Sequence, residues 1–301
     1  MGRPGQLRAV KASPWRDRDA DLATRFQDQV KLGMVNVSFV IAEPPDSFGS
    51  FENFSAVLRR IKELGYEGVE FNLTQPAGFE LNDLTRFAES IRLQVVSFLT
   101  GANYFRQGLC LSSPRIEVRE QAVEQLRKYA QIAAQFGAVL VIGQMQGFLS
   151  DEPDRAVGEA RIEESLKQVV AEAERHGATI AFEPVNHLQV GFNNSLMDVM
   201  GLMARIGSSH FKPMLDTFHM NIEERSVTEP IHRAGPNLAH FHLCESNGGL
   251  LGSGHLDFKA IFGAIKAIGY PGWVSVKTYR QPWAVGAEAS MRFLTELGVI
   301  A

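Results

Sequence analysis

The strongest constraint on the fold is a recurring unit in which an amphipathic run ends at a glycine and an apolar run follows. Gly137 precedes the apolar run Val139–Ile142, and Gly177 precedes Ile180–Phe182. Glycine suits the left-handed residue just past a helix end, so each glycine predicts a helix that is followed by a strand. The same punctuation recurs at Gly65, Gly207 and Gly269.

The apolar runs predict eight strands that alternate with helices. Continuous apolar strands in such an alternation indicate parallel strands that are buried on both faces. Eight units favour a closed barrel of the α/β class, the (β/α)8 TIM barrel, over an open doubly wound sheet. No glycine-rich phosphate-binding sequence follows the first strand, which also disfavours the open sheet. The expected strands lie near residues 34–40, 67–72, 94–99, 138–143, 179–183, 212–216, 238–243 and 272–277.

One barrel domain accounts for most of the 301 residues. We expect a short N-terminal extension over residues 1–32 and the barrel over residues 33–301. Two distant cysteines and the lack of an apolar signal core predict a cytoplasmic protein, and no run approaches the roughly 18 apolar residues of a membrane span. The net charge of −4 argues against a nucleic-acid partner, because such proteins usually present a basic face.

Four polar residues stand at the ends of four predicted strands. They are Glu183, Asp216, His242 and Lys277, at intervals of 33, 26 and 35 residues. Each interval is close to one strand plus one helix, so we expect all four at the rim where barrel enzymes build their active sites. Any one of them could simply cap a helix or face solvent. Three metal-ligand types on successive strands instead predict a divalent-metal site with one lysine beside it.

Three motifs surround these positions, namely Glu183–Asn186, Leu215–Glu224 and His242–Phe258. In them the chain resembles the xylose isomerase-like family of TIM-barrel sugar isomerases and epimerases, nearest its ketose 3-epimerase branch, which acts on D-tagatose and D-psicose. The resemblance covers residues 33–300. It implies a divalent metal, manganese first and magnesium or cobalt as alternatives, held by the three ligands named above and a second glutamate. Dimers and tetramers are common in this family, so a homo-oligomer is expected.

The chain departs from the family pattern at three positions on the substrate side. Lys277 stands where the family has the second metal-binding glutamate, which also acts as the base on the opposite face of the substrate. Gln189 replaces an acidic residue, and Gly248 replaces an arginine. The metal scaffold therefore resembles the epimerases more closely than the proton-transfer groups do.

Lys277 and a metal would oppose each other. A unit charge about 4 Å from a divalent ion is repelled by roughly 8 kcal/mol at an effective dielectric constant of about 20. Neutralising a lysine at pH 7 costs only about 4.6 kcal/mol. With metal bound, Lys277 should therefore be neutral or swing away. Without metal, a charged Lys277 could pair with Glu183 and Asp216.

The predicted catalytic residues are Glu183, as ligand and base, Lys277, as second base or Schiff-base former, and His219, which by the resemblance orients substrate oxygens. Further residues at strand ends and in rim loops are predicted to contact substrate. For some of them a loop contact or exposure to water is the alternative. These predicted substrate-binding residues are His219, Glu245, Gln189, Glu70, Gln144 and His187.

The predicted function is a divalent-metal-dependent isomerase or epimerase of an unphosphorylated ketose or keto-sugar derivative, acting through an enediolate. A base removes the proton beside the carbonyl, and a metal stabilises the resulting charge. The lack of an evident anion cradle favours an unphosphorylated sugar. Two alternatives stay open. One is a lyase or dehydratase acting on a 3-keto sugar or glycoside by the same chemistry, and the other is a non-catalytic sugar-binding relative with Lys277 in place of the metal.

Overall fold

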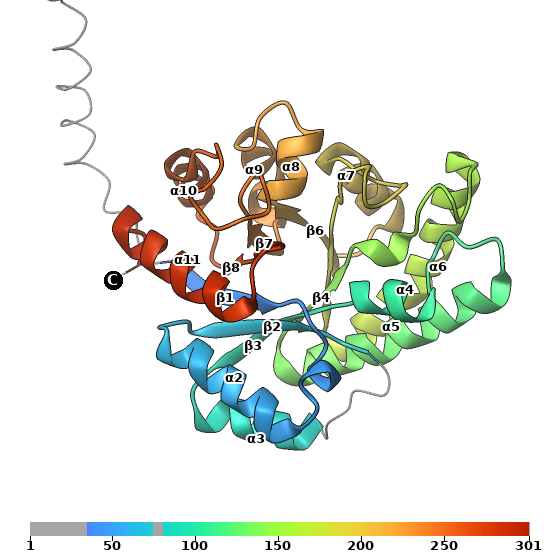
Figure 1. Ribbon diagram of the computed structural model, residues 1–301. Coiled ribbons are helices and arrows are strands. Elements are labelled where there is room, and N and C mark those ends of the chain that lie inside the picture. The colour runs from blue at the N-terminus through green and yellow to red at the C-terminus, as the bar shows by residue number, and fades with distance from the viewer. Residues whose placement is uncertain (1–34, 75–80, 301) are drawn as a thin grey trace, which may run out of the picture.

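Eight parallel strands close into a barrel in which each strand pairs with the next and β1 pairs with β8 (Figure 1). The computed structural model describes residues 35–74 and 81–300, so the predicted extension over residues 1–32 lies outside the described residues. The predicted (β/α)8 class is confirmed, and strand boundaries differ from the prediction by one or two residues. The strands are β1 (Asn36–Ile41), β2 (Gly68–Asn72), β3 (Gln94–Leu99), β4 (Val139–Ile142), β5 (Thr179–Phe182), β6 (Phe211–Asp216), β7 (His240–Leu243) and β8 (Trp273–Val276).

Helices lie round the outside of the strands (Figure 1). Gly137 and Gly177 end two of them with φ angles of 63° and 74°, a region that residues with a Cβ seldom adopt. These two glycines therefore lie at helix ends, as the sequence predicted. The α-helices in the described part of the chain are α2 (Phe51–Glu63), α3 (Leu81–Ser90), α4 (Gly101–Gln107), α5 (Ile116–Phe136), α6 (Arg155–His176), α7 (Leu196–Ile206), α8 (Thr217–Glu223), α9 (Glu229–Ala234), α10 (Phe258–Ala267) and α11 (Trp283–Leu297).

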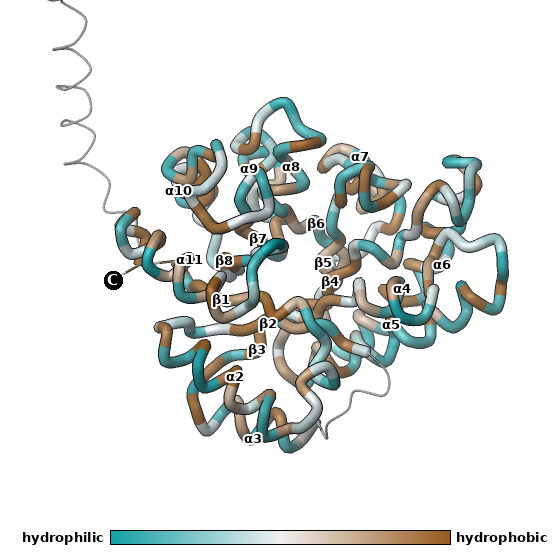
Figure 2. Tube along the Cα trace, viewed as in Figure 1, coloured by the Kyte–Doolittle hydropathy of each residue, from teal (hydrophilic) through white to brown (hydrophobic). Residues whose placement is uncertain are grey.

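Helix α2 illustrates how these helices cover the barrel. The Ser50 hydroxyl accepts a hydrogen bond from the Asn53 amide and so caps the first turn. Phe54, Leu58 and Ile61 then follow at helical spacing and are fully buried. Figure 2 shows the same pattern more widely, with hydrophobic residues concentrated on the strands and on helix faces turned toward them. No helix within residues 35–74 and 81–300 is both long and apolar enough to span a membrane.

The inside of the barrel is divided between an apolar part and a polar part. A polar chain begins where β1 meets β8, because the hydroxyls of Ser38 and Ser275 are hydrogen-bonded to each other. The Ser275 Oγ also lies 3.2 Å from Nε2 of His240 on β7. This polar part leads toward the rim that carries the candidate site. The apolar part is a small separate cluster made by Val40, Leu99, Val141, Ala181 and Met214.

Candidate active site

The barrel brings the four polar strand-end residues to one rim. Asp216 is the last residue of β6 and pairs in register with His242 on β7. Glu183 and Lys277 come one residue after β5 and β8, and their backbone amides extend the ladder by donating to carbonyls of the preceding strands, at 2.9 and 3.1 Å. The regular spacing in the sequence therefore corresponds to a common height in the barrel.

The three predicted metal ligands lie together. Nδ1 of His242 is 3.5 Å from Oδ2 of Asp216 and 3.6 Å from Oε1 of Glu183. All three side chains are almost completely buried. Among the residues that the structure describes, Nδ1 of His242 and Oε1 of Glu183 have no hydrogen-bond partner. Buried polar atoms nearly always have one, so two such atoms facing each other fit a divalent cation held between carboxylate and imidazole ligands.

Lys277 points into the same space and does not swing away. Its side chain is buried, with Nζ 3.6 Å from Oδ2 of Asp216 and 4.8 Å from the centre of the Tyr279 ring. Burial alone would lower the pKa of Lys277. The oxygen of Tyr279 and the carboxylates of Glu183 and Asp216 outweigh that effect and hold the pKa well above its ordinary value. The Lys277 ammonium therefore forms an ion pair with Asp216.

The two carboxyl groups respond to the same charges. Burial would raise the pKa of Glu183, but the Lys277 ammonium and the nearby rings of His242 and His219 lower it below the ordinary value. Burial would likewise raise the pKa of Asp216, and His219, Lys277 and His242 together lower it. Both groups are therefore carboxylates at neutral pH, which is the form that a metal ligand or a general base requires.

Asp216 has two separate tasks. Its Oδ1 accepts a hydrogen bond of 2.8 Å from the amide of Phe218 and caps α8, while Oδ2 faces His242 and Lys277. The buried thiol of Cys244 lies 3.4 Å from the same Oδ2. Because the cap holds the carboxylate, Oδ2 is aimed at the site, where Nε2 of His219 on the same helix lies 3.9 Å away.

His219, the predicted substrate-orienting residue, lies in the first turns of α8 and is buried beside the carboxylates. Its Nδ1 is 2.7 Å from the side-chain amide nitrogen of Asn186, which holds the ring. Its Nε2 is 3.6 Å from Oε1 of Glu183 and 3.5 Å from the hydroxyl of Tyr279. Burial lowers the pKa of His219 below its usual value. Sequence reasoning quoted Asn186 in a motif but gave it no role.

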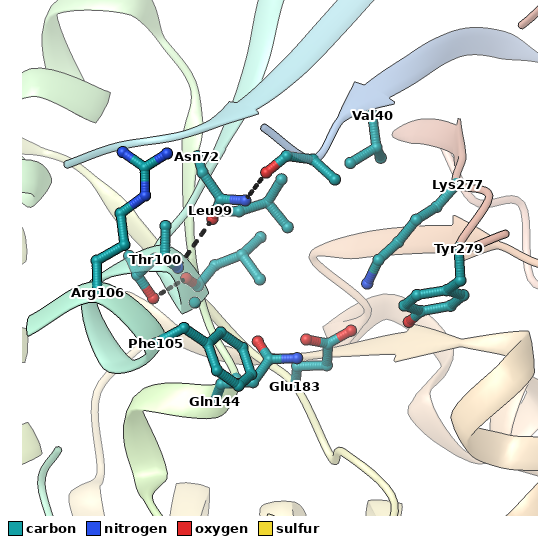
Figure 3. A pocket seen from close by; sticks show the side chains of 15 residues that line it. Val40, Asn72, Leu99, Thr100, Phe105, Arg106, Gln144, Glu183, Lys277 and Tyr279 are labelled. Atoms are coloured by element: carbon teal, nitrogen blue, oxygen red, sulfur yellow. Dashed lines mark hydrogen bonds between the residues drawn. The ribbon is translucent and has the colours of Figure 1, made fainter. Parts of the chain in front are cut away.

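A cavity of about 280 Å³ opens beside these residues (Figure 3). The Glu183 carboxylate and the Lys277 amine point into it, and the predicted residue Gln144 lies on its wall near Glu183. Sequence reasoning missed several other wall residues. Their signal was present, because polar or aromatic residues lie at or just after the ends of β2, β3 and β8. These residues are Asn72, Thr100 and Tyr279, and Arg106 lies farther along the chain in α4.

Two predicted substrate-binding glutamates have their oxygens engaged elsewhere, and neither lines the cavity. Glu70 is fully buried inside the barrel, where it contacts His240 and His242. Glu245 is also fully buried, and its oxygens accept hydrogen bonds from the amides of Ser246 and Gly252 at 2.8 and 2.9 Å. Glu245 therefore shapes a rim loop, and Glu70 lies beneath the site.

The last two predicted substrate contacts stand in the loop after β5 and outside this cavity. His187 is exposed, with Nδ1 2.6 Å from Oε1 of Glu223. Gln189 is partly exposed, and its backbone amide donates to the carbonyl of Asn186. Neither is among the residues that line the described cavity. A role for either would need a substrate that reaches beyond this space.

Comparison with known proteins places the chain in a family. The sequence profile of the family described as xylose isomerase-like TIM barrel matches residues 58–297. The chain belongs to this family. The resemblance found in the sequence motifs is confirmed, and the barrel is the family's fold.

The relatives that resemble this chain include several sugar epimerases. An L-ribulose 3-epimerase of Mesorhizobium japonicum is 29% identical over 229 residues, which cover 74% of each chain. A 3-dehydro-D-guloside 4-epimerase of Escherichia coli is 25% identical over 232 residues, covering 74% of this chain and 86% of the relative. A solved L-ribulose 3-epimerase matches with a TM-score of 0.75 at 24% identity, over 88% of this chain and 95% of that one, which bears on the fold alone. The sequence relatives support the prediction of an isomerase or epimerase.

Proposed function

We propose that this protein is a divalent-metal-dependent epimerase or isomerase of an unphosphorylated ketose or keto-sugar. The observation that carries the proposal is a pair of buried atoms, His242 Nδ1 and Glu183 Oε1, which face each other beside a small cavity and have no hydrogen-bond partner within residues 35–74 and 81–300. The relatives are named as epimerases at carbon 3 or carbon 4 of sugars. Manganese is the first candidate metal, with magnesium and cobalt as alternatives.

Glu183, Asp216 and His242 would hold the ion, which when bound supplies Lewis-acid stabilisation of the negative charge that develops on substrate oxygens. Glu183 also points into the cavity and is a carboxylate, so it would accept the proton from the carbon beside the carbonyl. His219, held by Asn186, would donate a hydrogen bond from Nε2 to a substrate oxygen.

Lys277 supplies the second proton-transfer group. It enters the cavity from the end of β8, whereas Glu183 enters from the end of β5 (Figure 3). A substrate carbon between them has one group on each face. Glu183 takes a proton from one face, and Lys277, which is neutral beside the bound ion, passes a proton from water to the other face, which inverts the carbon. The two groups regain their starting states by exchanging protons with solvent, so the inverted carbon carries a solvent proton.

The cavity suits a single sugar unit. Its volume of about 280 Å³ is near the lower end of small-molecule sites, which begin at about 300 Å³. Gln144 offers a side-chain amide to a sugar, whereas Asn72 and Thr100 are hydrogen-bonded to the backbone, and the ring of Phe105 gives a face on which sugar carbons can pack. Arg106 on the wall is already paired with Asp46, with Nη1 2.9 Å from Oδ2. That pairing agrees with a substrate that lacks a phosphate.

The test is proton exchange in heavy water. Metal-free protein reconstituted with Mn²⁺ is incubated with a panel of unphosphorylated ketoses and 3-keto glycosides, and deuterium at each carbon is followed by NMR. We expect deuterium beside the carbonyl of at least one sugar, together with its epimer or isomer, and loss of both with EDTA. Lys277→Met should lower kcat by about 10²–10⁴-fold, whereas the exposed Lys128→Met on α5 should not.

Two outcomes would reject the proposal. No exchange with any sugar, with binding retained, would indicate a non-catalytic sugar-binding protein. Activity that appears only in Lys277→Glu would mean that the natural lysine does not serve the ketose reaction. A lyase is the second candidate, because the Lys277 ammonium points into the cavity and could protonate a departing oxygen. A released leaving group in place of a rearranged sugar would identify it.

A further inference from the structure

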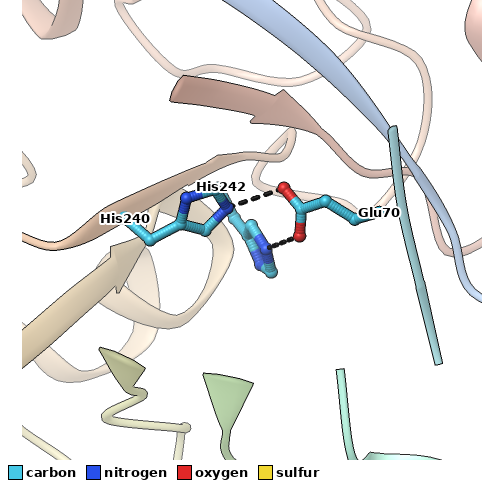
Figure 4. A group of neighbouring side chains, drawn as sticks. All are labelled: Glu70, His240 and His242. Carbon is cyan, nitrogen blue, oxygen red and sulfur yellow. Dashed lines mark hydrogen bonds and ion pairs between the residues drawn. The ribbon is translucent and has the colours of Figure 1, made fainter. Parts of the chain in front are cut away.

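A buried carboxylate lies directly beneath the histidine of the candidate metal site. Glu70 projects from β2 into the barrel, where Oε2 is 3.1 Å from Nε2 of His242 and Oε1 is 2.6 Å from Nε2 of His240 (Figure 4). The three side chains are at most 2% exposed. Since β2 and β7 are not neighbouring strands, these hydrogen bonds cross the interior of the barrel.

The contact decides how His242 uses its two ring nitrogens. With Nε2 donating to Glu70, the lone pair that remains for coordination is on Nδ1. Nδ1 is the atom that has no partner among the described residues and that faces Glu183 and Asp216. A carboxylate behind a metal-binding histidine fixes the tautomer and ring orientation and raises the basicity of the coordinating nitrogen.

Glu70 is itself held in place from two sides. The hydroxyl of Ser97 donates to Oε2, the same oxygen that faces His242. His240 engages Oε1 and lies 3.2 Å from the hydroxyl of Ser275. The carboxylate is therefore fixed within a hydrogen-bonded chain that reaches from the β1–β8 junction to the rim. It has no side exposed to the cavity and so cannot touch a sugar there.

The separations also bear on a second metal site. Glu70, His240 and His242 are residue types that bind metals, and their ligand atoms lie close together. The 2.6 Å between Oε1 and Nε2 of His240 is, however, the distance of a direct hydrogen bond. This geometry favours a supporting network over an ion between these groups.

We propose that Glu70 is a positioning residue that orients His242 and strengthens metal binding at Nδ1. The inference rests on the proposed function, because it assumes that His242 is a metal ligand. Glu70 acts only through His242. Ser97 and His240 contribute by holding the Glu70 carboxylate.

The experiment measures metal affinity apart from activity. Metal-free wild type, Glu70→Gln and Ser97→Ala are titrated with Mn²⁺ by calorimetry, with Glu172→Gln as the matched control. Glu172 is also a buried glutamate, 2% exposed, but it lies on the outer helix α6. We expect Glu70→Gln to raise the Kd by about 10–100-fold, Ser97→Ala to raise it by less, and the control to leave it unchanged.

A spectroscopic measurement separates positioning from general damage. At saturating Co²⁺, the visible absorption spectrum should change in Glu70→Gln and stay the same in Glu172→Gln, because only the first alters a ligand's orientation. A Kd within about twofold of wild type together with an unchanged spectrum would overturn the inference. Two Mn²⁺ per wild-type chain, one of them lost in Glu70→Gln, would also overturn it by identifying a second metal site.

Two further results have defined meanings. If Glu70→Gln fails to fold, Ser97→Ala decides, since it removes only one hydroxyl: a raised Kd with an altered Co²⁺ spectrum supports the inference, and unchanged values overturn it. If wild type binds no metal, both the proposed function and this inference fail. If wild type binds metal with a measurable Kd and Glu70→Gln leaves that Kd unchanged, only this inference is rejected and the proposed function stands.

Discussion

At the scale of single residues, Lys277 places a cation beside the carboxylates of the candidate site. Its ammonium lies 3.6 Å from an oxygen of Asp216 and shares the cavity with Glu183. The lysine and a divalent ion would therefore compete for the same carboxylates. The strength of metal binding should therefore depend on the charge at position 277.

Replacing this charge gives a direct prediction. Lys277→Glu removes a repulsive cation and adds a carboxylate, so the Kd for Mn²⁺ should fall by at least about tenfold. The Kd of Lys277→Met, in which only the charge is removed, should lie between the Kd of Lys277→Glu and that of wild type. Calorimetric titration of the metal-free proteins measures both. Equal affinity in all three proteins would show that the lysine does not oppose the metal.

A glycine fixes the position of the base. Gly143, just after β4, packs so closely that an added Cβ would collide with Oε2 of Glu183. Gly143→Ala should displace that carboxylate and lower kcat by about 10²-fold, because misplacement near 1 Å can cost that much. Gly263→Ala in α10 is the control, since its Cβ would meet no atom within 4 Å. Steady-state kinetics on any turned-over ketose measures both, and an unchanged kcat in Gly143→Ala would contradict the prediction.

At the scale of elements, α5 and α6 are joined by a buried carboxylate. Glu172 on α6 accepts hydrogen bonds from Gln131 and Arg127 on α5, at 2.8 and 3.2 Å, and pairs with Arg175 and His176 on its own helix. The hydrogen bond from Gln131, followed by those from the arginines and the histidine, lowers the pKa of Glu172 to about 2. This helix pair is therefore held in part by a charge that acid removes.

The sign of the pH effect follows from this pKa. A carboxyl group in an unfolded chain titrates near pH 4.3, so the ionised Glu172 stabilises the fold fully above about pH 4.5. That contribution disappears as the pH falls toward 2. Wild type should be more stable than Glu172→Gln at pH 6, and the difference should shrink below about pH 4. Urea unfolding at a series of pH values measures it. A difference that is constant with pH would show that the charge is not responsible.

The sequence predicted elements better than it predicted contacts. Strand and helix order followed from apolar runs and glycines, because both are local signals. The position of Glu183, Asp216, His242 and Lys277 at one rim followed from their spacing. The partners of Glu70 could not be predicted from the sequence, because its hydrogen bonds to residues about 170 positions away depend on barrel register and closure. Its prediction as the end of the second strand was wrong, because β2 continues to Asn72 and Glu70 lies in the middle of the strand.

At the scale of the whole molecule, the site joins distant parts of the barrel. Its proposed metal ligands come from the ends of β5, β6 and β7, and Lys277 follows β8. An ion held by three separate strands should connect them in the folded state only, because the ligands come together only when the barrel has formed. Metal binding should therefore stabilise the fold as a whole.

This coupling predicts a measurable shift. Free Mn²⁺ at about 100 times its Kd should raise the free energy of unfolding by about 2.7 kcal/mol, and EDTA should reverse the change. Asp216→Ala should show no such increase, because Oδ2, which faces His242 Nδ1 at 3.5 Å, is one of the proposed ligand atoms. Thermal or urea unfolding of both proteins with and without Mn²⁺ measures the increase in the free energy of unfolding. An equal increase in Asp216→Ala would place the stabilising ion elsewhere.

The pairing of β1 with β8 has a consequence for biosynthesis. β8 is made after the other seven strands, yet it closes the barrel, and the residue that follows it completes the cavity. While a ribosome is still translating this stretch, the emerging polypeptide lacks both the closing strand and Lys277. Until β8 is made, the edges of the sheet are unpaired and can associate with other nascent chains. The complete active site should form in a single late step.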